Sequence, residues 1–141
     1  MPRPFALYQV AFKILLRRGK LVLWLKSSDT QFWDLPGGRI NVGEEHTPLE
    51  KILAREVGEE LGSQLRYRLG KPILQFHRPI RTTARYKFIT VYNASYQNGS
   101  IKLSHEHSEV HWLNPRQYPF RRRDFGYGEE YQAFRRHFGW K

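Results

Sequence analysis

The alternation of apolar and polar residues predicts strands at the beginning of the chain. Residues 5–17 are rich in strand formers, and the apolar residues near position 10 recur at every second position, the period of a strand with one buried face. Arg18 and Gly19 indicate a turn. Residues 21–25 (LVLWL) then form an unbroken apolar run, which is typical of a strand buried on both faces.

A helical spacing of apolar residues follows over residues 48–61. Thr47 is a good N-cap, Pro48 suits the first helical position, and Glu50 completes a capping box. Gly62 is a suitable C-terminal stop. The side chains expected to face the core are those of Leu49, Ile52, Leu53, Val57 and Leu61.

The second half of the chain predicts three more strands and a final helix. Strand-like segments occupy about residues 65–78, 85–97 and 109–113, and residues 97–100 (QNGS) form a strong turn signal between the last two. Residues 129–138 have the apolar spacing of a short helix. These elements predict an α/β domain with a mixed β-sheet, a central helix and a C-terminal helix.

Length and composition narrow the class of protein. A chain of 141 residues suits one domain with one core, here residues 1–141. Apolar residues make up 40% and aromatic residues 15%, which excludes a disordered chain, and the absence of cysteine excludes disulfides and thiolate sites. No apolar run approaches the length of a membrane span, and the first residues lack the apolar core of a signal peptide. We therefore expect a cytoplasmic protein without membrane contact.

The charge is strongly basic and unevenly distributed. The net charge is +11, which favours phosphate-bearing partners by long-range attraction. Six of the 13 acidic residues nevertheless lie between Glu44 and Glu60, a segment with net charge −4 against +15 for the rest. Such a segment is either a solvated helix face or a site for metal and phosphate.

The spacing of three glutamates favours the metal site. Glu56, Glu59 and Glu60 are at i, i+3 and i+4, so they share one face of the predicted helix. Crowded carboxylates repel one another unless a cation lies between them, and oxygen-only ligands suit hard ions such as Mg²⁺ or Mn²⁺. Gly37 and Gly38, which precede the helix, allow the backbone to approach a ligand closely.

Residues 35–62 (LPGGRINVGEEHTPLEKILAREVGEELG) resemble the signature box of the Nudix hydrolases, the MutT-like family. That box reads Gly, five residues, Glu, seven residues, then Arg-Glu-apolar-any-Glu-Glu-any-Gly-apolar. The matching positions are Gly38, Glu44, Arg55, Glu56, Val57, Glu59, Glu60 and Gly62. Two positions depart from it, because ten residues separate Glu44 from Arg55 and Ser63 replaces the final apolar residue. The longer loop leaves open whether Glu44 or Glu45 pairs with Arg55.

The resemblance implies a fold, a reaction and a set of site residues. The fold would be a Nudix-type α/β/α sandwich. The reaction would be attack of water on phosphorus in a nucleoside diphosphate linked to another moiety, with Mg²⁺ or Mn²⁺ bound to Glu56, Glu59, Glu60 and the carbonyl of Gly37. The general base would be Glu56 or a glutamate on a later loop, Glu106 or Glu109. We favour Glu106, both as base and as metal ligand, because Glu109 begins a predicted strand.

The substrate is less well defined by the sequence. Candidates for phosphate contacts are Arg39, Arg78, Arg81, Arg85 and Lys87, since arginine suits bidentate phosphate binding. The leading substrate class is a nucleotide sugar, a (d)NTP or a similar molecule. One alternative is the 5′ end of RNA, which the basic remainder of the chain and the arginine-rich run at 120–125 favour. Another is a non-catalytic nucleotide or RNA sensor on the same fold. The resemblance also allows a homodimer.

Overall fold

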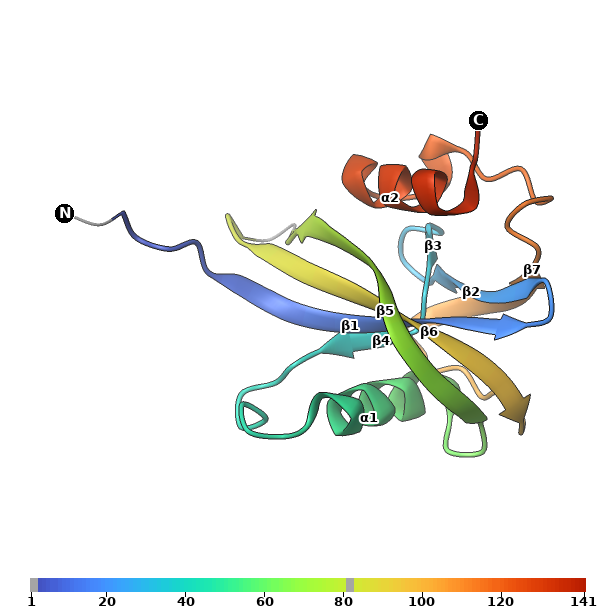
Figure 1. The fold of residues 1–141 in the computed structure, drawn as a ribbon, viewed down its shortest axis with the longest axis horizontal. Helices are drawn as coiled ribbons and strands as arrows, with labels where there is room; N and C mark the ends of the chain where they lie inside the picture. The colour runs from blue at the N-terminus through green and yellow to red at the C-terminus, as the bar shows by residue number, and fades with distance from the viewer. Residues whose placement is uncertain (1–2, 81–82) are drawn as a thin grey trace.

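The computed structural model describes residues 3–80 and 83–141 (Figure 1). Within these residues the chain forms seven strands, two α-helices and one short 3-10 helix. In chain order they are β1 (Tyr8–Arg18), β2 (Leu21–Ser27), β3 (Trp33–Asp34), β4 (Gly37–Arg39), α1 (Leu49–Leu61), β5 (Arg66–Pro79), β6 (Tyr86–Asn98), β7 (His107–Leu113), η1 (Arg122–Asp124) and α2 (Gly128–Phe138). The mixed sheet and the two helices confirm the predicted fold class.

Strand β1 is the centre of the sheet. It runs parallel to β6, from Tyr8 opposite Tyr86 to Arg17 opposite Ser95, and β5 is antiparallel on the far side of β6. The other edge of β1 pairs with β4 along its middle and with β2 at its end. Gly37 and Gly38, which precede α1 in the sequence, lie on β4, so this pairing fixes both glycines against β1.

The sequence predicts that the turn at residues 97–100 joins two paired strands, but in the structure it does not. Strand β7 pairs with β2, not with β6. Gly99 has φ +98°, and a Cβ there would lie 1.9 Å from the carbonyl oxygen of Gln64. The turn therefore packs against the segment that follows α1, and the chain crosses over from β6 to reach β2.

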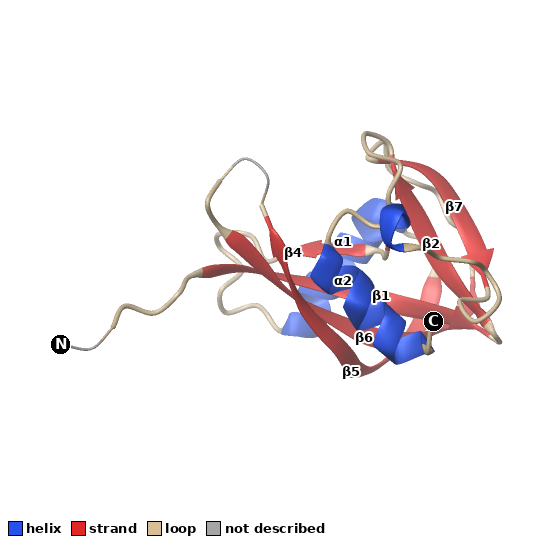
Figure 2. Cartoon of the chain, turned by 90° about the horizontal axis from the view of Figure 1, so that it is seen from above, coloured by secondary structure: helices blue, strands red, loops and turns tan. Residues whose placement is uncertain are grey.

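The helices cover opposite faces of the sheet, as Figures 1 and 2 show, and each encloses its own core. The core under α1 contains Ile52, Leu53, Val57 and Leu61 together with Phe12, Ile14, Leu16, Leu23 and Leu25. The core under α2 contains Phe134, Phe138 and Tyr131 together with Leu15, Val22, Trp24, Ile89 and Val91. Alternate residues of β2 enter different cores, which confirms that its apolar run is buried on both faces.

Helix α1 confirms most of its predicted features, with two corrections. The N-cap is Pro48, and no side-chain hydrogen bond caps the helix, so the capping box expected from Thr47 and Glu50 does not form. Leu49 is 49% exposed, because it lies in the first turn beyond the edge of the core. Gly62 ends the helix as predicted, with φ +87° and its N–H donated to the carbonyl of Gly58.

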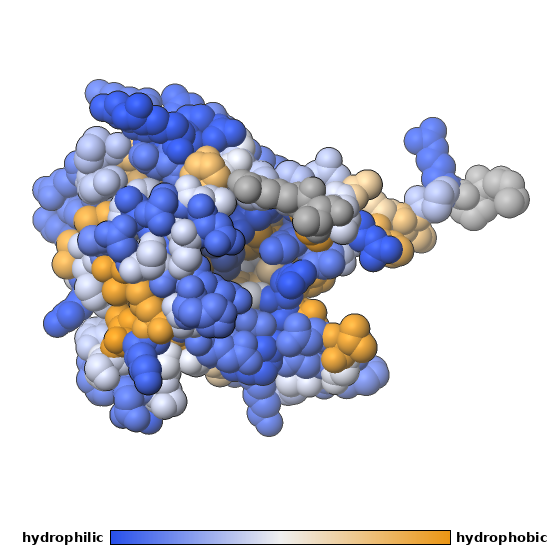
Figure 3. Space-filling model, turned by 180° about the vertical axis from the view of Figure 1, so that it is seen from behind, coloured by the Kyte–Doolittle hydropathy of each residue, from blue (hydrophilic) through white to orange (hydrophobic). Residues whose placement is uncertain are grey.

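The first strand begins later than predicted. Residues 5–7 precede β1 and form an arm that projects from the body (Figure 1), on which Phe5 is 92% and Leu7 85% exposed. Hydrophilic side chains dominate the face in Figure 3, where hydrophobic groups are small and separate. Among the residues that the structure describes, neither helix has the length and apolar character needed to cross a bilayer.

Candidate active site

The glutamates of α1 point away from the core that holds the helix. Val57 and Leu61 are buried against the sheet, whereas Glu56, Glu59 and Glu60 all line a pocket of about 380 Å³. Their exposure differs, because the side chain of Glu59 is 60% exposed while that of Glu56 is only 14% exposed. The pocket is therefore deepest at Glu56 and Glu60.

The two glycines of β4 bring the backbone against these carboxylates. A Cβ on Gly38 would lie 1.9 Å from Oε2 of Glu56, so the carboxylate occupies the space that any side chain would need. A Cβ on Gly37 would lie 2.0 Å from the carbonyl oxygen of Phe12, and Gly37 has φ +149°. Gly37 is thus required by the strand pairing and the backbone conformation, whereas Gly38 leaves room for the Glu56 carboxylate.

Arg55 organises the acidic side of the pocket. Its Nε and Nη2 donate to the carboxylate of Glu44 at 2.7 and 2.6 Å, and its Nη1 donates to Glu56 at 2.8 Å and to Glu59 at 3.2 Å. The hydrogen bonds to Glu44 raise the pKa of Arg55, and the same contacts lower the pKa of Glu44. The partner left open by the longer loop is therefore Glu44, since Glu45 accepts from the backbone N–H of Gly43.

Glu60 is a buried carboxylate that accepts the backbone N–H of Gly37 at 3.2 Å. Burial raises its pKa to about 8; the positive charge of Lys13 opposes this rise, whereas the charges of Asp34 and Glu106 add to it. A carboxylate in this setting gains most from a cation beside it, because a cation compensates the loss of hydration.

A chain of paired charges starts at the wall of the pocket and extends to α2. Nζ of Lys13 lies 2.9 Å from Oδ1 of Asp34 and also donates to the carbonyl of Leu35. Asp34 and the buried Glu130 in turn pair with Arg78. Burial alone would raise the pKa of Asp34, but Lys13 and Arg78 hold it well below its usual range. The chain connects β1, β3, β5 and α2 through charges.

Most of the predicted site residues come together in the pocket. Glu106 lines it, whereas Glu109 does not and instead contacts His111. Arg39, Arg78 and Lys87 line the same pocket as the α1 glutamates. Arg85 is exposed and does not line the pocket, and Arg81 lies outside the described residues.

Three of the ionisable residues that line the pocket are absent from the predicted site: Lys13, Asp34 and His107. The sequence marks Lys13 only as a polar interruption of the apolar run at residues 10–16 of β1. Nδ1 of His107 is buried and has no hydrogen-bond partner among the described residues. Burial lowers the pKa of His107, so its imidazole is neutral near pH 7.

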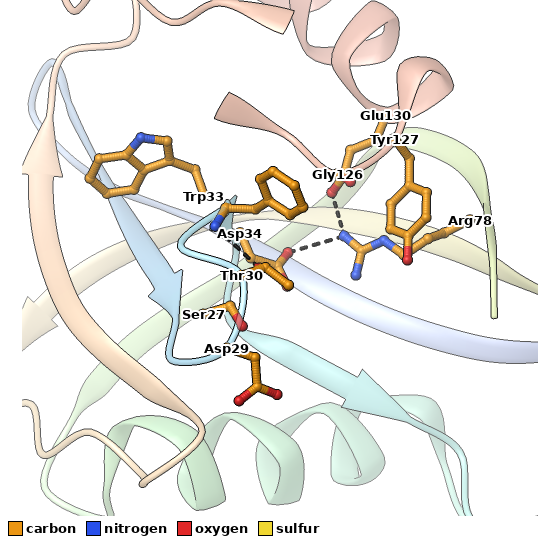
Figure 4. A pocket seen from close by; sticks show the side chains of 10 residues that line it. Ser27, Asp29, Thr30, Trp33, Asp34, Arg78, Gly126, Tyr127 and Glu130 are labelled. Carbon is orange, nitrogen blue, oxygen red and sulfur yellow. Dashed lines mark hydrogen bonds and ion pairs between the residues drawn. The ribbon is translucent and has the colours of Figure 1, made fainter. Parts of the chain in front are cut away.

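A second cavity of about 260 Å³ adjoins the pocket and shares Asp34 and Arg78 with it (Figure 4). Phe32, Trp33 and Tyr127 supply aromatic walls, and the Arg78 guanidinium carbon lies 5.4 Å from the Tyr127 ring centroid. In Figure 4 the ion pairs from Arg78 to Asp34 and Glu130 cross this cavity. An aromatic cavity thus lies directly beside a charged one.

The carboxylates fit a hard divalent cation. Glu56, Glu59, Glu60 and Glu106 supply only oxygen ligands, as do the backbone carbonyls of the glycine strand. Within residues 3–80 and 83–141 no three acidic or histidine side chains are already gathered around one point. In the structure, Arg55 donates to the carboxylate of Glu56, and the N–H of Gly37 donates to that of Glu60. Because Gly38 has no Cβ, the Glu56 carboxylate can lie against the backbone of β4, within the pocket that the other glutamates line.

Comparison with known proteins agrees with this geometry. The family model of the NUDIX domain matches residues 7–135. A MutT protein from Methanosarcina mazei Go1 superposes with a TM-score of 0.74 at 25% identity over 95% of each chain. A MutT NUDIX hydrolase from Burkholderia pseudomallei has a TM-score of 0.68 at 20% identity, over 91% of this chain and 96% of its own.

A relative in Bacillus subtilis (strain 168), named "Putative 8-oxo-dGTP diphosphatase", is 43% identical over 54 residues. This match covers 38% of the present chain and about a third (34%) of that protein. The NUDIX domain model, in contrast, covers most of the chain, and the solved structures share its fold. The protein therefore belongs to the Nudix family.

Proposed function

We propose that this protein hydrolyses the pyrophosphate bond of a nucleoside diphosphate linked to another moiety, with Mg²⁺ or Mn²⁺ as cofactor. One observation carries the proposal, namely that carboxylates and cations line the same pocket in nearly equal number. The carboxylates are Asp34, Glu56, Glu59, Glu60 and Glu106, and the cations are Lys13, Arg39, Arg78 and Lys87. A divalent ion suits the first set and a diphosphate suits the second.

The cations differ in how free they are to bind phosphate. Lys13 and Arg78 are committed to Asp34, so they supply a fixed positive field. Arg39 donates one N–H to Gln9 at 2.8 Å and keeps its other donors for a ligand. Lys87 has no ion-pair partner among the described residues, and burial lowers its pKa to about 8. We assign phosphate contact to Arg39 and Lys87.

Glu106 is our proposed general base. When bound, the metal would neutralise phosphate oxygens and lower the pKa of the attacking water. The water oxygen forms a bond to phosphorus, the bridging P–O bond breaks, and the water proton passes to a carboxylate. The carboxylate of Glu106 has no hydrogen-bond partner among the described residues, whereas that of Glu56 is held by Arg55. A free carboxylate on the pocket wall is better placed to accept the proton.

The aromatic cavity beside the pocket supports a nucleoside as one part of the substrate. Phe32 and Tyr127 offer ring faces and edges for a base or ribose, whereas Trp33 is buried and its ring contacts Lys26. Arg78 and Asp34 lie on both cavities, so a ligand that spans them would place its phosphates toward the glutamates. A nucleoside triphosphate belongs in the substrate panel because of the matched segment in the Bacillus subtilis relative.

The test is a panel of (d)NTPs, 8-oxo-dGTP, nucleotide sugars and 5′-triphosphate RNA with Mg²⁺, with the products identified by chromatography. We expect nucleoside monophosphate release from at least one substrate and a loss of at least 100-fold in Glu60→Gln. Glu109→Gln is the matched control, because Glu109 lies near the site in sequence but outside the pocket. Equal turnover by Glu60→Gln and wild type would refute the proposal.

The same panel decides the remaining alternatives. Cleavage confined to RNA 5′ ends would replace the small-molecule substrate with RNA. Tight nucleotide binding without product release would identify a sensor. A base at Glu106 predicts a larger fall in kcat for Glu106→Gln than for Glu109→Gln, with little change in KM. A fall confined to Glu56→Gln would move the assignment to Glu56.

A further inference from the structure

A separate cavity lies where the β1–β2 turn meets the end of α2. Its volume is about 400 Å³, and it shares no residue with the pocket of the α1 glutamates. The turn and the C-terminal end of α2 lie at the same end of the molecule (Figures 1 and 2). The lining consists of Arg17, Gly19, Lys20, Asn114, Pro115, Arg116, Gln117 and Phe138.

Three cations line this cavity and no carboxylate does. None of Arg17, Lys20 and Arg116 forms an ion pair in the part of the chain that the structure describes. This differs from the other organised cations of the molecule, since Lys13, Arg55 and Arg78 each have acidic partners. The positive charge of this cavity is therefore uncompensated.

The two guanidinium groups are nevertheless held in place. Nε of Arg17 donates to Oδ1 of Asn93 at 3.0 Å, and Nη1 of Arg116 donates to the carbonyl of Phe138 at 3.1 Å. These bonds use neutral acceptors and leave further N–H groups of both arginines without a partner among the described residues. Arginines fixed in this way present preorganised donors at little cost in side-chain entropy.

Repulsion between the cations adds to the effect of burial on the pKa values of neighbouring groups. Burial and then the charge of Arg116 lower the pKa of Arg17. Burial followed by the charges of Arg17 and Arg116 lowers the pKa of His137 on α2. An anion in the cavity would relieve this repulsion, because it would offset the positive field that both shifts report.

We propose that the cavity formed by Arg17, Lys20 and Arg116 binds a phosphate group at a site separate from the catalytic pocket. The guanidinium forks match the oxygens of a phosphate, and Lys20 and the Gln117 amide add further donors. Free phosphate or pyrophosphate supplies such a group, and so does the phosphodiester backbone of a nucleic acid. Carboxylic acid ligands fit less well, because three cations favour more than one negative charge.

The test measures binding of defined probes by the full chain without Mg²⁺, so that turnover does not enter the readout. Inorganic phosphate and pyrophosphate are titrated by calorimetry, and a short unphosphorylated oligoribonucleotide is titrated by fluorescence anisotropy at several salt concentrations. We expect Lys20→Gln and Arg116→Gln to weaken binding of at least one probe by about 10-fold each. Loss limited to the two inorganic ions identifies free anions as the source, and loss limited to the oligonucleotide, with a reduced salt slope, identifies a phosphodiester.

Arg136→Gln is the matched control, because Arg136 is an exposed cation of α2 that does not line the cavity. Lys20 is exposed in the turn, so its replacement leaves the fold intact even where loss of Arg17 would not. If Arg136→Gln weakens binding as much as the cavity variants do, the interaction depends only on the overall charge, and the proposed site is wrong. The proposed site is also wrong if the wild-type protein binds none of the probes. We expect Arg116→Gln to turn over nucleotides at the wild-type rate, because Arg116 does not line the catalytic pocket. A failure of the phosphate site is therefore distinguishable from a failure of the catalytic proposal.

Discussion

Replacement of Gly38 by alanine should inactivate the enzyme without unfolding it. The added Cβ would lie 1.9 Å from Oε2 and 2.2 Å from Cδ of Glu56, both atoms at the end of a side chain. Ordinary contact begins near 3.4 Å, so the carboxylate must move by about 1.5 Å. The backbone does not resist the change, because Gly38 is not among the glycines with positive φ.

Gly38→Ala should have a large effect on kcat and a small effect on the free energy of unfolding. A displacement of about 1 Å at a catalytic group costs on the order of 100-fold in rate, which corresponds to about 2.7 kcal/mol in the barrier. The folded state loses little, because the Glu56 side chain rotates away and alanine restricts the unfolded chain, a gain of about 0.4–1 kcal/mol. We expect a kcat about 100-fold below wild type and a change in unfolding free energy within about 1 kcal/mol.

The matched control is Gly58→Ala on the same helix as the glutamates. A Cβ on Gly58 meets no atom within 4 Å outside its own helical backbone, so alanine should raise the unfolding free energy by about 0.5–1 kcal/mol and leave kcat unchanged. Steady-state kinetics and urea unfolding of both variants provide the measurements. A Gly38→Ala enzyme with more than a third of wild-type activity would refute the steric argument, as would an equal loss in Gly58→Ala.

Three further variants probe the charges around the pocket. Glu130→Ala should lower the unfolding free energy by about 3 kcal/mol in urea, because it removes a buried partner of Arg78, and the exposed Glu129→Ala should cost less than about 1 kcal/mol. The pKa of Lys87, about 8, predicts that KM rises as the pH passes upward through 8, since the free enzyme then loses a cation. Lys87→Arg should remove this step from the pH profile of KM. A profile that is the same in Lys87→Arg and wild type would contradict the assignment of Lys87 to phosphate contact. Arg55→Lys should lower kcat about 10-fold, because lysine cannot reproduce the paired hydrogen bonds; kcat equal to wild type would show that positioning is unimportant.

Local patterns in the sequence predicted the elements and the acidic half of the site. The helical spacing of α1 placed Glu56, Glu59 and Glu60 on one face, and the structure places them on one pocket. Glu106 joined them because its loop directly precedes β7, the strand that pairs with β2. The shared face of α1 could be predicted because spacing within one element is a local property, whereas the catalytic and metal-binding roles of these residues stay predictions.

The features that escaped prediction depend on which distant segments meet. Strand β7 pairs with β2, and Gly99 packs against Gln64, and no local turn signal contains either contact. Lys13 appears in the sequence as a polar interruption of a strand, and only the fold brings Asp34 to its side chain. Glu130 lies in the first turn of α2, and only the fold places Arg78 of β5 against it.

The parallel pairing of β1 with β6 also has a consequence for how the chain folds. Tyr8 pairs with Tyr86, 78 positions later, so the central ladder closes only after most of the chain has been synthesised. Such non-local contacts give a high contact order, and folding on the millisecond-to-second scale is expected, not microseconds. A ribosome-bound chain that ends before β6 contains all of α1 but lacks the strand that pairs in parallel with β1. The glutamates of α1 therefore emerge early, and the pocket that they line is completed late.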